Sequence, residues 1–187
     1  MPFVALDFET PSTRRSSAYA VGIVVFDRDS IRYEWFSWLA PSGMCEAAPQ
    51  AITHLDQEGA HVVMPTPSVL RLAHTLWPIL DGATIVSHTH YDETVVNAIS
   101  KAAEIPPPGG VWIDSCTIAR KVWSELPNHR LKTVCNHINY RFWHHHPLED
   151  ARACAHIVRT AMRVTGWNSH ALRDAFGRVR RRAGQYA

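Results

Sequence analysis

The chain has 187 residues and a mass of 21.1 kDa, which is the size of one ordinary globular domain. With 46% hydrophobic and 19% charged residues it is neither disordered nor collagen-like, and no apolar run approaches the ~20 residues of a membrane-spanning helix. The net charge of +2 is divided unevenly, because residues 1–110 carry −6 and residues 111–187 carry +8. This asymmetry suits a polyanionic substrate brought to carboxylates that hold cations, but a solvated basic helix explains the last stretch equally well.

The pattern of apolar runs and turn residues predicts a meander of strands followed by alternating helices and strands. The expected strands cover 3–6, 18–26, 31–39, 84–87 and 111–114. The expected helices cover 66–80, 91–104, 115–125, 130–138 and 148–164, with two short helices in 40–65 and a last basic helix after Asn168. Thr66 is expected as the first N-cap, with Pro67 as the first helical residue. The order indicates one α/β domain, with a body at 1–165 and a basic helix or tail at 166–187.

The N-terminal residues and the cysteines favour a reducing, cytoplasmic location. Residues 1–7 contain no basic leader and end on a carboxylate, so a secretory signal is not expected. The cysteines are far apart and form no C-x-x-C pair, which argues against a disulfide framework and against a zinc ribbon. They are Cys45, Cys116, Cys135 and Cys154.

Two carboxylates end the first expected strand, in the segment Asp7-Phe8-Glu9-Thr10. Side chains alternate along a strand, so Asp7 and Glu9 point to the same side. Two like charges this close repel each other unless a cation or a proton lies between them. The pair therefore indicates a cation site, although solvated acids at an exposed strand end give the same pattern.

A second polar segment, 87–92, lies where an expected strand meets an expected helix. Asp92 is here a candidate third carboxylate ligand near a helix N-terminus. The H-x-H-x-D spacing of His88, His90 and Asp92 also resembles the zinc motif of the metallo-β-lactamase fold, which implies a zinc hydrolase. In that family another His directly follows the Asp, whereas this chain has Glu93. A third interpretation makes the two histidines polar residues at the edge of a cleft.

The third segment contains three consecutive histidines, His144 to His146, followed by Pro147. Pro147 favours an extended residue before it and a helix start after it, which puts Asp150 in the first helical turn. On extended backbone His145 faces away from its two neighbours, so a chelate of three histidines is not expected. A histidine cluster on a surface loop is the alternative interpretation.

In their order and spacing, the three segments resemble the motifs of the DEDDh family of 3′→5′ exonucleases. This family belongs to the ribonuclease H-like superfamily and includes the proofreading subunit of bacterial replicative DNA polymerase. The resemblance covers about residues 2–165 and implies a ribonuclease H-like fold, with a mixed central β-sheet flanked by α-helices. It also implies two divalent ions, Mg²⁺ or Mn²⁺, and hydrolysis of phosphodiester bonds to nucleoside 5′-monophosphates. The residues that it assigns are the metal ligands Asp7, Glu9, Asp92 and Asp150 and the general base His145.

The resemblance implies that the substrate is the 3′ end of single-stranded DNA or RNA. Candidate substrate-binding residues are Thr10, which follows the carboxylates, His54, and His88, where the family often has Asn. No clear clamp-binding motif follows Val164, no membrane partner is expected, and the oligomeric state is open. The alternatives are an RNA-trimming enzyme resembling oligoribonuclease or ribonuclease T, the zinc hydrolase, and a non-catalytic nucleic-acid-binding module.

Overall fold

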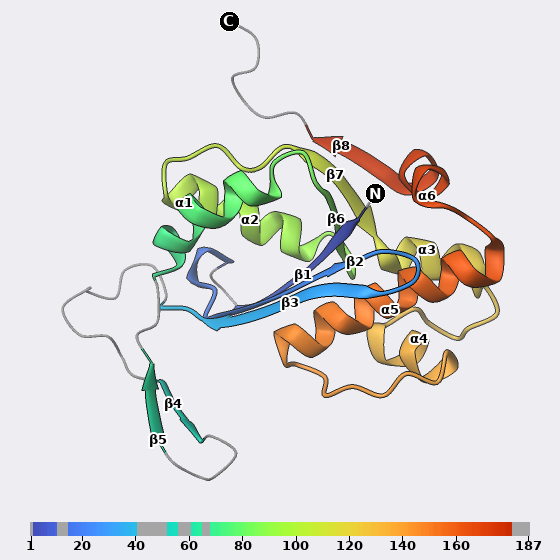
Figure 1. Ribbon diagram of the computed structural model, residues 1–187, viewed down its shortest axis with the longest axis horizontal. Coiled ribbons are helices and arrows are strands. Elements are labelled where there is room, and N and C mark those ends of the chain that lie inside the picture. Colours follow the sequence, from blue (N-terminus) through green and yellow to red (C-terminus); the bar gives the residue numbers. More distant parts are fainter. Residues whose placement is uncertain (1, 11–14, 41–51, 56–60, 65–67, 181–187) are drawn as a thin grey trace, which may run out of the picture.

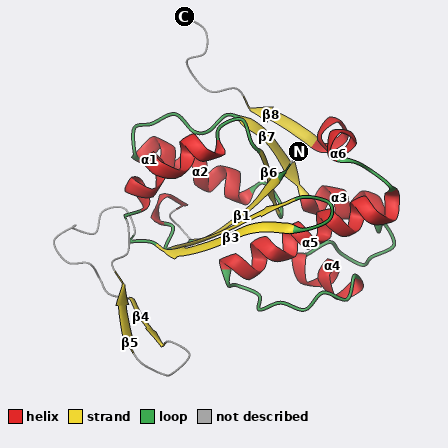
Figure 2. Cartoon of the chain, in the orientation of Figure 1, coloured by secondary structure: helices red, strands yellow, loops and turns green. Residues whose placement is uncertain are grey.

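The structure is a computed structural model that describes residues 2–10, 15–40, 52–55, 61–64 and 68–180, with only the backbone described at 52–55 and 61–64. Figure 1 shows the elements along the chain and Figure 2 their secondary structure. The strands are β1 (Phe3–Glu9), β2 (Ala20–Phe26), β3 (Ile31–Trp38), β4 (Ile52–Leu55), β5 (His61–Met64), β6 (Thr84–Ser87), β7 (Gly110–Asp114) and β8 (Gly177–Arg180). The helices are the 3-10 turn η1 (Arg15–Ser17), α1 (Val69–Leu80), α2 (Tyr91–Ala102), α3 (Ser115–Val122), α4 (Leu131–His137), α5 (Pro147–Thr165) and α6 (Ser169–Phe176).

The central sheet has six strands in the order β3-β2-β1-β6-β7-β8. The strands β3, β2 and β1 form an antiparallel meander, β6 and β7 run parallel to β1, and β8 is antiparallel at the far edge. Helices cover both faces of the sheet (Figure 1). This arrangement confirms the expected mixed sheet flanked by helices. Within the described residues, no helix is both long enough and apolar enough to cross a membrane.

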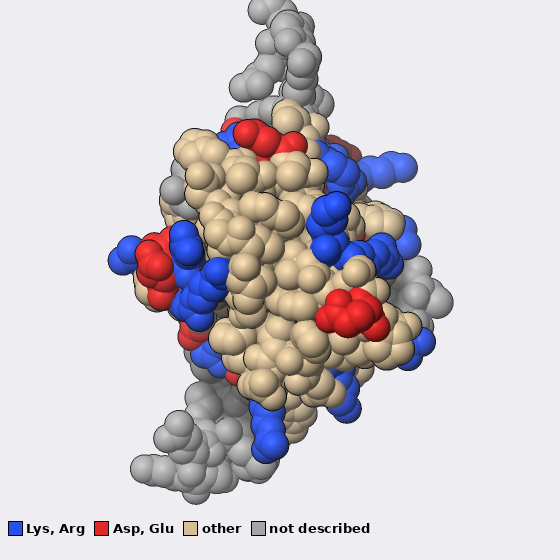
Figure 3. Space-filling model, turned by 90° about the vertical axis from the view of Figure 1, so that its right-hand side faces the viewer, with Lys and Arg blue, Asp and Glu red and all other residues tan. Residues whose placement is uncertain are grey.

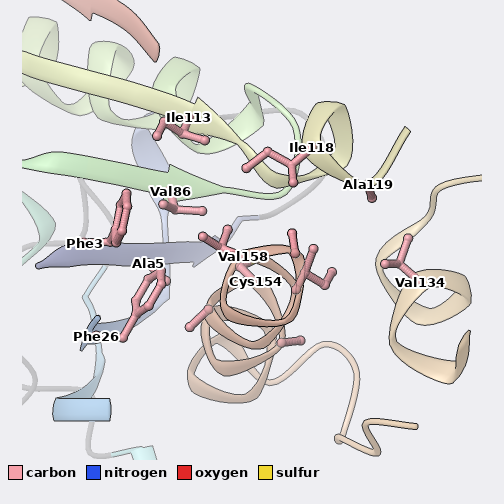
Figure 4. Close-up of a cluster of buried hydrophobic side chains, with 14 of the residues drawn as sticks. Phe3, Ala5, Phe26, Val86, Ile113, Ile118, Ala119, Val134, Cys154 and Val158 are labelled. Atoms are coloured by element: carbon pink, nitrogen blue, oxygen red, sulfur yellow. The ribbon is translucent and has the colours of Figure 1, made fainter. Parts of the chain in front are cut away.

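Each face of the sheet has its own hydrophobic core, because side chains alternate along the strands. Phe3 and Ala5 of β1 belong to the core under α3, α4 and α5, whereas Leu6 belongs to the core under α1 and α2. Figure 4 shows the first core, to which the helices contribute Ile118, Ala119, Val134, Cys154 and Val158. Continued along β1, the same alternation turns Asp7 and Glu9 toward α5.

The beginning of α5 lies directly on β2 at Gly22. A Cβ atom at this position would lie 2.3 Å from the backbone carbonyl carbon of Pro147 and 2.4 Å from the backbone nitrogen of Leu148. Gly22 also pairs with Asp7 across β2 and β1. The missing side chain therefore lets the first turn of α5, which contains Asp150, come next to Asp7.

Side-chain caps fix where several helices begin. Ser68 caps α1, Asp114 caps α3 and Asn168 caps α6, each by accepting a backbone N–H of the first turn. The helix α5 ends at Gly166, whose φ of 73° is the left-handed conformation common after a helix. The cap expected at Thr66, which lies outside the described residues, is wrong because Ser68 holds that position.

The two short helices expected in 40–65 are not found at the described residues 52–55 and 61–64, and the rest of that segment from residue 41 onward lies outside the described residues. In the described part of this segment, β4 and β5 pair as an antiparallel two-stranded sheet of their own. The sequence contains the reason, because Ile52-Thr53 and Val62-Val63 are β-branched residues that favour strands over helices.

The basic helix expected after Asn168 is confirmed as α6, which ends at Phe176. Residues 177–180 instead pair with β7 as β8. This pairing satisfies backbone groups that β7 would otherwise present at an open sheet edge. Gly177 permits the turn, because a Cβ there would lie 2.2 Å from the carbonyl oxygen of Arg173.

The close contact at Gly22 can be tested by substitution with alanine. Because the atoms in contact belong to the backbone, β2 or α5 must shift to accommodate a methyl group. We expect Gly22→Ala to lower the free energy of unfolding by about 3 kcal/mol, measured by urea denaturation in chelator. Gly82→Ala is the control, since Gly82 has a φ of 77° and open space around a Cβ. Its backbone cost is about 1 kcal/mol, and equal losses in the two variants would contradict the packing role of Gly22.

Candidate active site

Three carboxylates from two elements meet where β1 ends. Asp7 and Glu9 lie on β1 and Asp150 lies in the first turn of α5. One oxygen of each carboxylate lies within 4.8 Å of an oxygen of both others. The sequence predicted the pairing of Asp7 with Glu9 from strand alternation, and the Gly22 contact brings Asp150 to them.

Asp92 is the fourth acidic residue, in the first turn of α2 on the other side of β1. Its side chain is almost fully buried, and its Oδ1 accepts the backbone N–H of Phe8 at 2.8 Å. This bond ties the start of α2 to β1 between Asp7 and Glu9. Asp92 thus has one oxygen engaged by the protein, and its charge acts on Asp7.

Burial and mutual repulsion raise the pKa values of Asp7, Asp92 and Glu9, which favours the protonated form of these three carboxyls when no cation is present. Burial, and then the charges of Asp92, Asp150 and Glu9, raise the pKa of Asp7 well above its usual range. Burial likewise raises the pKa of Asp92 to about 7, and burial followed by the charge of Asp150 raises the pKa of Glu9. A divalent cation would relieve this repulsion in place of the protons.

The donors of this site fit hard divalent cations. Asp7, Glu9 and Asp150 offer only carboxylate oxygens, which are the ligands that Mg²⁺ and Mn²⁺ prefer. Asp92 adds a further carboxylate on the other side of β1. The four residues are therefore a suitable set for divalent metal ions.

The histidine loop before α5 approaches the same carboxylates. Nδ1 of His144 lies 3.2 and 3.1 Å from the two oxygens of Asp150, and the backbone N–H of His145 donates to Asp150 Oδ2 at 3.2 Å. The rings of His144 and His145 stack, with centroids 4.0 Å apart. His146 lies elsewhere, with its ring stacked on Phe36.

The expectation that His145 faces away from His144 is wrong. It assumed extended backbone, but His145 has a φ of 68°, in the left-handed region. This conformation brings both rings to the same side, next to Asp150. Among the described residues, the histidine-containing group that could share an ion contains His144 and His145 with Asp150 and does not contain His146.

The three candidate substrate-binding residues have different surroundings. The Thr10 hydroxyl lies 2.5 Å from the Tyr91 hydroxyl, so it is connected to the start of α2. Both ring nitrogens of His88 have protein partners, Ser115 Oγ and the carbonyl oxygen of His129, each at 2.9 Å. His54 lies on β4, and its side chain is outside the described part of the structure. Substrate contact by these three residues remains a prediction.

The zinc-hydrolase interpretation of residues 88–92 is wrong. His88 uses both ring nitrogens inside the protein, and burial lowers its pKa, which favours a neutral structural imidazole. Two groups of described residues could each share one ion, and neither contains His88 or His90. Asp92 instead faces β1.

Several residues that support the site received no role from the sequence. His144 contacts Asp150 directly, and Ser115 holds His88. Asp114 accepts the backbone N–H of Thr89 at 2.9 Å, which joins the ends of β6 and β7. Asp114 ends a predicted strand and Ser115 directly follows it, at the sheet edge that holds the carboxylates, and this position is a signal that could have identified them.

Comparison with solved structures identifies the fold. Exonuclease X in complex with 5′-overhanging duplex DNA has a TM-score of 0.59 and 19% identity, over 92% of this chain and 98% of that one. A 3′-exonuclease that recognises the histone mRNA stem-loop has a TM-score of 0.65 and 13% identity, over 98% and 88%. The nuclease domain of 3′hExo, a DEDDh family member bound to rAMP, has a TM-score of 0.63 and 10% identity, over 97% and 96%.

These neighbours are exonucleases, and this chain has their ribonuclease H-like fold over nearly its whole length. The fold expected from the motifs is therefore confirmed. Compared by sequence, the chain matches no model of a protein family and no curated protein. At identities of 10 to 19% the likeness establishes the fold.

The raised carboxyl pKa values predict how stability without metal depends on pH. Between about pH 4 and 7 the folded state holds protons on Asp92 and Asp7 that the unfolded state has released, so these groups stabilise the protein less as pH rises. His88 acts in the opposite direction, because its lowered pKa favours folding as pH rises. We therefore expect Asp92→Asn, compared with the parent in chelator, to gain relative stability from about pH 5 to pH 8.

The measurement is urea denaturation of both proteins in chelator across this pH range. The amide introduced by Asp92→Asn keeps an oxygen that can accept the Phe8 N–H, so the substitution removes the titration and keeps the hydrogen bond. A divalent cation added at the upper end of the range should stabilise the parent more than the variant. A stability difference that does not change with pH would contradict the raised pKa of Asp92.

Proposed function

We propose that this protein is a 3′→5′ exonuclease that hydrolyses phosphodiester bonds in DNA or RNA and releases nucleoside 5′-monophosphates. The observation that carries the proposal is the meeting of Asp7, Glu9 and Asp150 within 4.8 Å, beside the buried Asp92 and a histidine loop. Exonuclease neighbours with the same fold support it. A binding module without catalysis has no need for repelling carboxylates in a partly buried position.

The four carboxylates would hold two divalent ions, Mg²⁺ or Mn²⁺. Bound there, such ions supply an activated water and stabilise the charge on the leaving oxygen. Asp7 interacts with all three other acidic residues and would help to hold both ions, Glu9 and Asp150 would help to hold one of them, and Asp92 the other. The Phe8 N–H fixes Asp92 and the histidine loop fixes Asp150, so both carboxylates are held in place before substrate arrives.

His145 is proposed as the general base that accepts the proton of the attacking water. His144 has its Nδ1 directed to Asp150, whereas the exposed ring of His145 makes no hydrogen bond with another described residue. The charges of both histidines act on Glu9, that of His145 more strongly. His145 is thus the imidazole that is both close to the carboxylates and free to take a proton.

The proposed substrate is the 3′ end of a single strand of DNA or RNA, with Thr10, His54 and His88 near the terminal nucleotides. Similar structures hold either nucleic acid, since one contains duplex DNA with a 5′ overhang and another recognises an mRNA stem-loop. An RNA-trimming enzyme resembling oligoribonuclease or ribonuclease T is the same chemistry with a narrower substrate.

The surface gives partial support to a basic path for nucleic acid. On the face at the right-hand end of Figure 1, Lys and Arg side chains stand in separate groups around a largely uncharged centre (Figure 3). Several basic residues of the described chain also have acidic or carbonyl partners, as Arg159 does at the carbonyl oxygens of residues 28 and 29. The excess positive charge of residues 111–187 would therefore attract a polyanion at long range. It would contribute less to binding nucleic acid along one continuous basic surface.

We also propose a reducing, cytoplasmic location. Of the cysteines, Cys116, Cys135 and Cys154 are free and buried, and Cys45 lies outside the described residues. Burial raises the pKa of Cys135 to about 12, which keeps this thiol protonated and unreactive. Free buried thiols suit a reducing compartment.

The proposal predicts metal-dependent hydrolysis that begins at a 3′ end and needs Asp7. The assay uses linear and circular single strands of DNA and RNA with Mg²⁺, Mn²⁺ or chelator. We expect mononucleotides from the linear strands, no cutting of circles, and a loss of at least about 10³-fold in Asp7→Asn because both ions depend on that carboxylate.

Glu125→Gln is the matched control, because it removes an exposed carboxylate that makes an ion pair of 3.7 Å to His137, away from the acidic group. It should keep the parent rate. Efficient cutting of a circular strand would show that the enzyme is an endonuclease. An active Asp7→Asn variant would contradict the assignment of Asp7 as a metal ligand.

His145→Ala should lose about 10²–10⁴-fold in turnover, the usual contribution of a positioned general base. Metal and nucleic acid should still bind, because all four carboxylates remain. His146→Ala, whose ring packs on Phe36, should lose much less, and His144→Ala should lose less than His145→Ala. Turnover of the three variants in saturating Mg²⁺ is the measurement. If His144→Ala is inactive and His145→Ala remains active, the general base is His144 and the assignment of His145 is wrong.

A further inference from the structure

A second set of metal-ligand atoms adjoins the carboxylates. One nitrogen of His144, one nitrogen of His145 and one oxygen of Asp150 lie within 4.8 Å of one another. Asp150 thus belongs both to an all-oxygen group with Asp7 and Glu9 and to a group with two imidazoles. The first group suits Mg²⁺, whereas imidazole nitrogen is a ligand of Zn²⁺ and other transition metals.

The distances fit a zinc ion at the second group. In a tetrahedral site with bonds of about 2.0–2.1 Å, two ligand atoms lie about 3.4 Å apart. His144 Nδ1 lies 3.1 Å from Asp150 Oδ2, so a small outward movement of the imidazole admits the ion. His145 is exposed, and its ring can turn toward the same point without disturbing the core.

The backbone brings the two imidazoles together at an energetic cost. His145 has a left-handed φ of 68°, which is sterically unfavourable for a residue with a side chain. Extended backbone at this position would point the rings to opposite sides, whereas the observed one stacks them at 4.0 Å. Asp150 is buried and is fixed by the His145 N–H, so one ligand of the set is already in position.

We propose that His144, His145 and Asp150 form a zinc site that adjoins the carboxylate site for Mg²⁺ and shares Asp150 with it, and that zinc bound there inhibits the enzyme. Three protein ligands leave a fourth position for water on the exposed side, as in zinc sites that are not fully closed. The inhibition part rests on the proposed function. A bound zinc would coordinate the His145 imidazole, which then could not accept a proton, and would also coordinate an oxygen of Asp150.

The binding test is calorimetric titration of the full chain with Zn²⁺ in excess Mg²⁺, which fills the all-oxygen site. We expect one zinc per chain, and a loss of affinity of at least about 100-fold in His144→Gln and in His145→Gln, because loss of an indirect contact already costs about 10–100-fold. His146→Gln, outside the set, and Asp7→Asn, which removes only an oxygen ligand of the other group, should keep the affinity.

Cu²⁺ in place of zinc gives a readout on the unsubstituted protein, because its electron paramagnetic resonance spectrum should show coupling to two imidazole nitrogens. A parent that binds no zinc, a spectrum without nitrogen coupling, or zinc binding that Asp7→Asn removes and His144→Gln preserves would each overturn the site.

The inhibition test measures hydrolysis in Mg²⁺ as zinc is added, relative to each protein's own zinc-free rate. Half-inhibition of His144→Gln should need at least about 100-fold more zinc than that of the parent, in line with its lost affinity. If zinc binds without slowing hydrolysis, the proposed inhibition is wrong, whereas the proposed zinc site stands. A protein that hydrolyses no nucleic acid would refute the proposed function, and the binding test would still decide the site.

Discussion

The contact between Gly22 and the beginning of α5 holds together carboxylates that repel one another. A side chain at Gly22 would collide with the backbone of Pro147, so α5 can lie next to Asp7 only because this position of β2 has none. The rest of α5 follows the same principle, since it presents small residues such as Ala151 and Ala155 to the sheet. The packing energy of the core under α5 opposes the electrostatic cost of the site.

The floor of the site is neutral as well as close-packed. Burial, and then the charges of Asp7 and Asp92, raise the pKa of Cys154 well above its usual range, so this thiol stays uncharged beneath the acids. Ser115, fully buried, hydrogen-bonds both Cys154 and His88. Below the carboxylates the protein thus places groups that add no negative charge, which leaves the solvent side as the direction from which cations can compensate the acids.

Much of the fold could be predicted from the sequence because its elements are strongly patterned. The expected strand 84–87 coincides with β6, the helix expected from about residue 91 begins at Tyr91, and alternation along β1 predicts the common direction of Asp7 and Glu9. In each case the prediction rests on side chains that alternate with a period of two residues, or on a sharp change in composition at the end of an element.

The features that could not be predicted from the sequence depend on single backbone angles or on tertiary contacts. The direction of the His145 ring follows from a left-handed φ, which no residue type at that position signals, since glycine is the usual occupant. Residues 177–180 form a strand because β7 offers an edge, and a basic composition gives no sign of that pairing. Gly22 was part of an ordinary strand pattern, and its importance appears only when the start of α5 lies on it.

The strand β8 shows why the basic charge of the second half is not simply a surface for nucleic acid. Arg178 Nη2 contacts Glu93 Oε2 at 2.6 Å, and Arg180 lies 3.7 Å from Oε1 of the same carboxylate and also contacts Asn97. Glu93 directly follows Asp92. Ion pairs at the surface contribute about 0–1 kcal/mol each, and these pairs, which are only partly exposed, have a small effect on stability beside that of the core. Their effect on position is larger, because they join the far edge of the sheet to the first turn of α2. Arginines that look in sequence like a free basic tail thereby help to orient the helix that carries a proposed metal ligand.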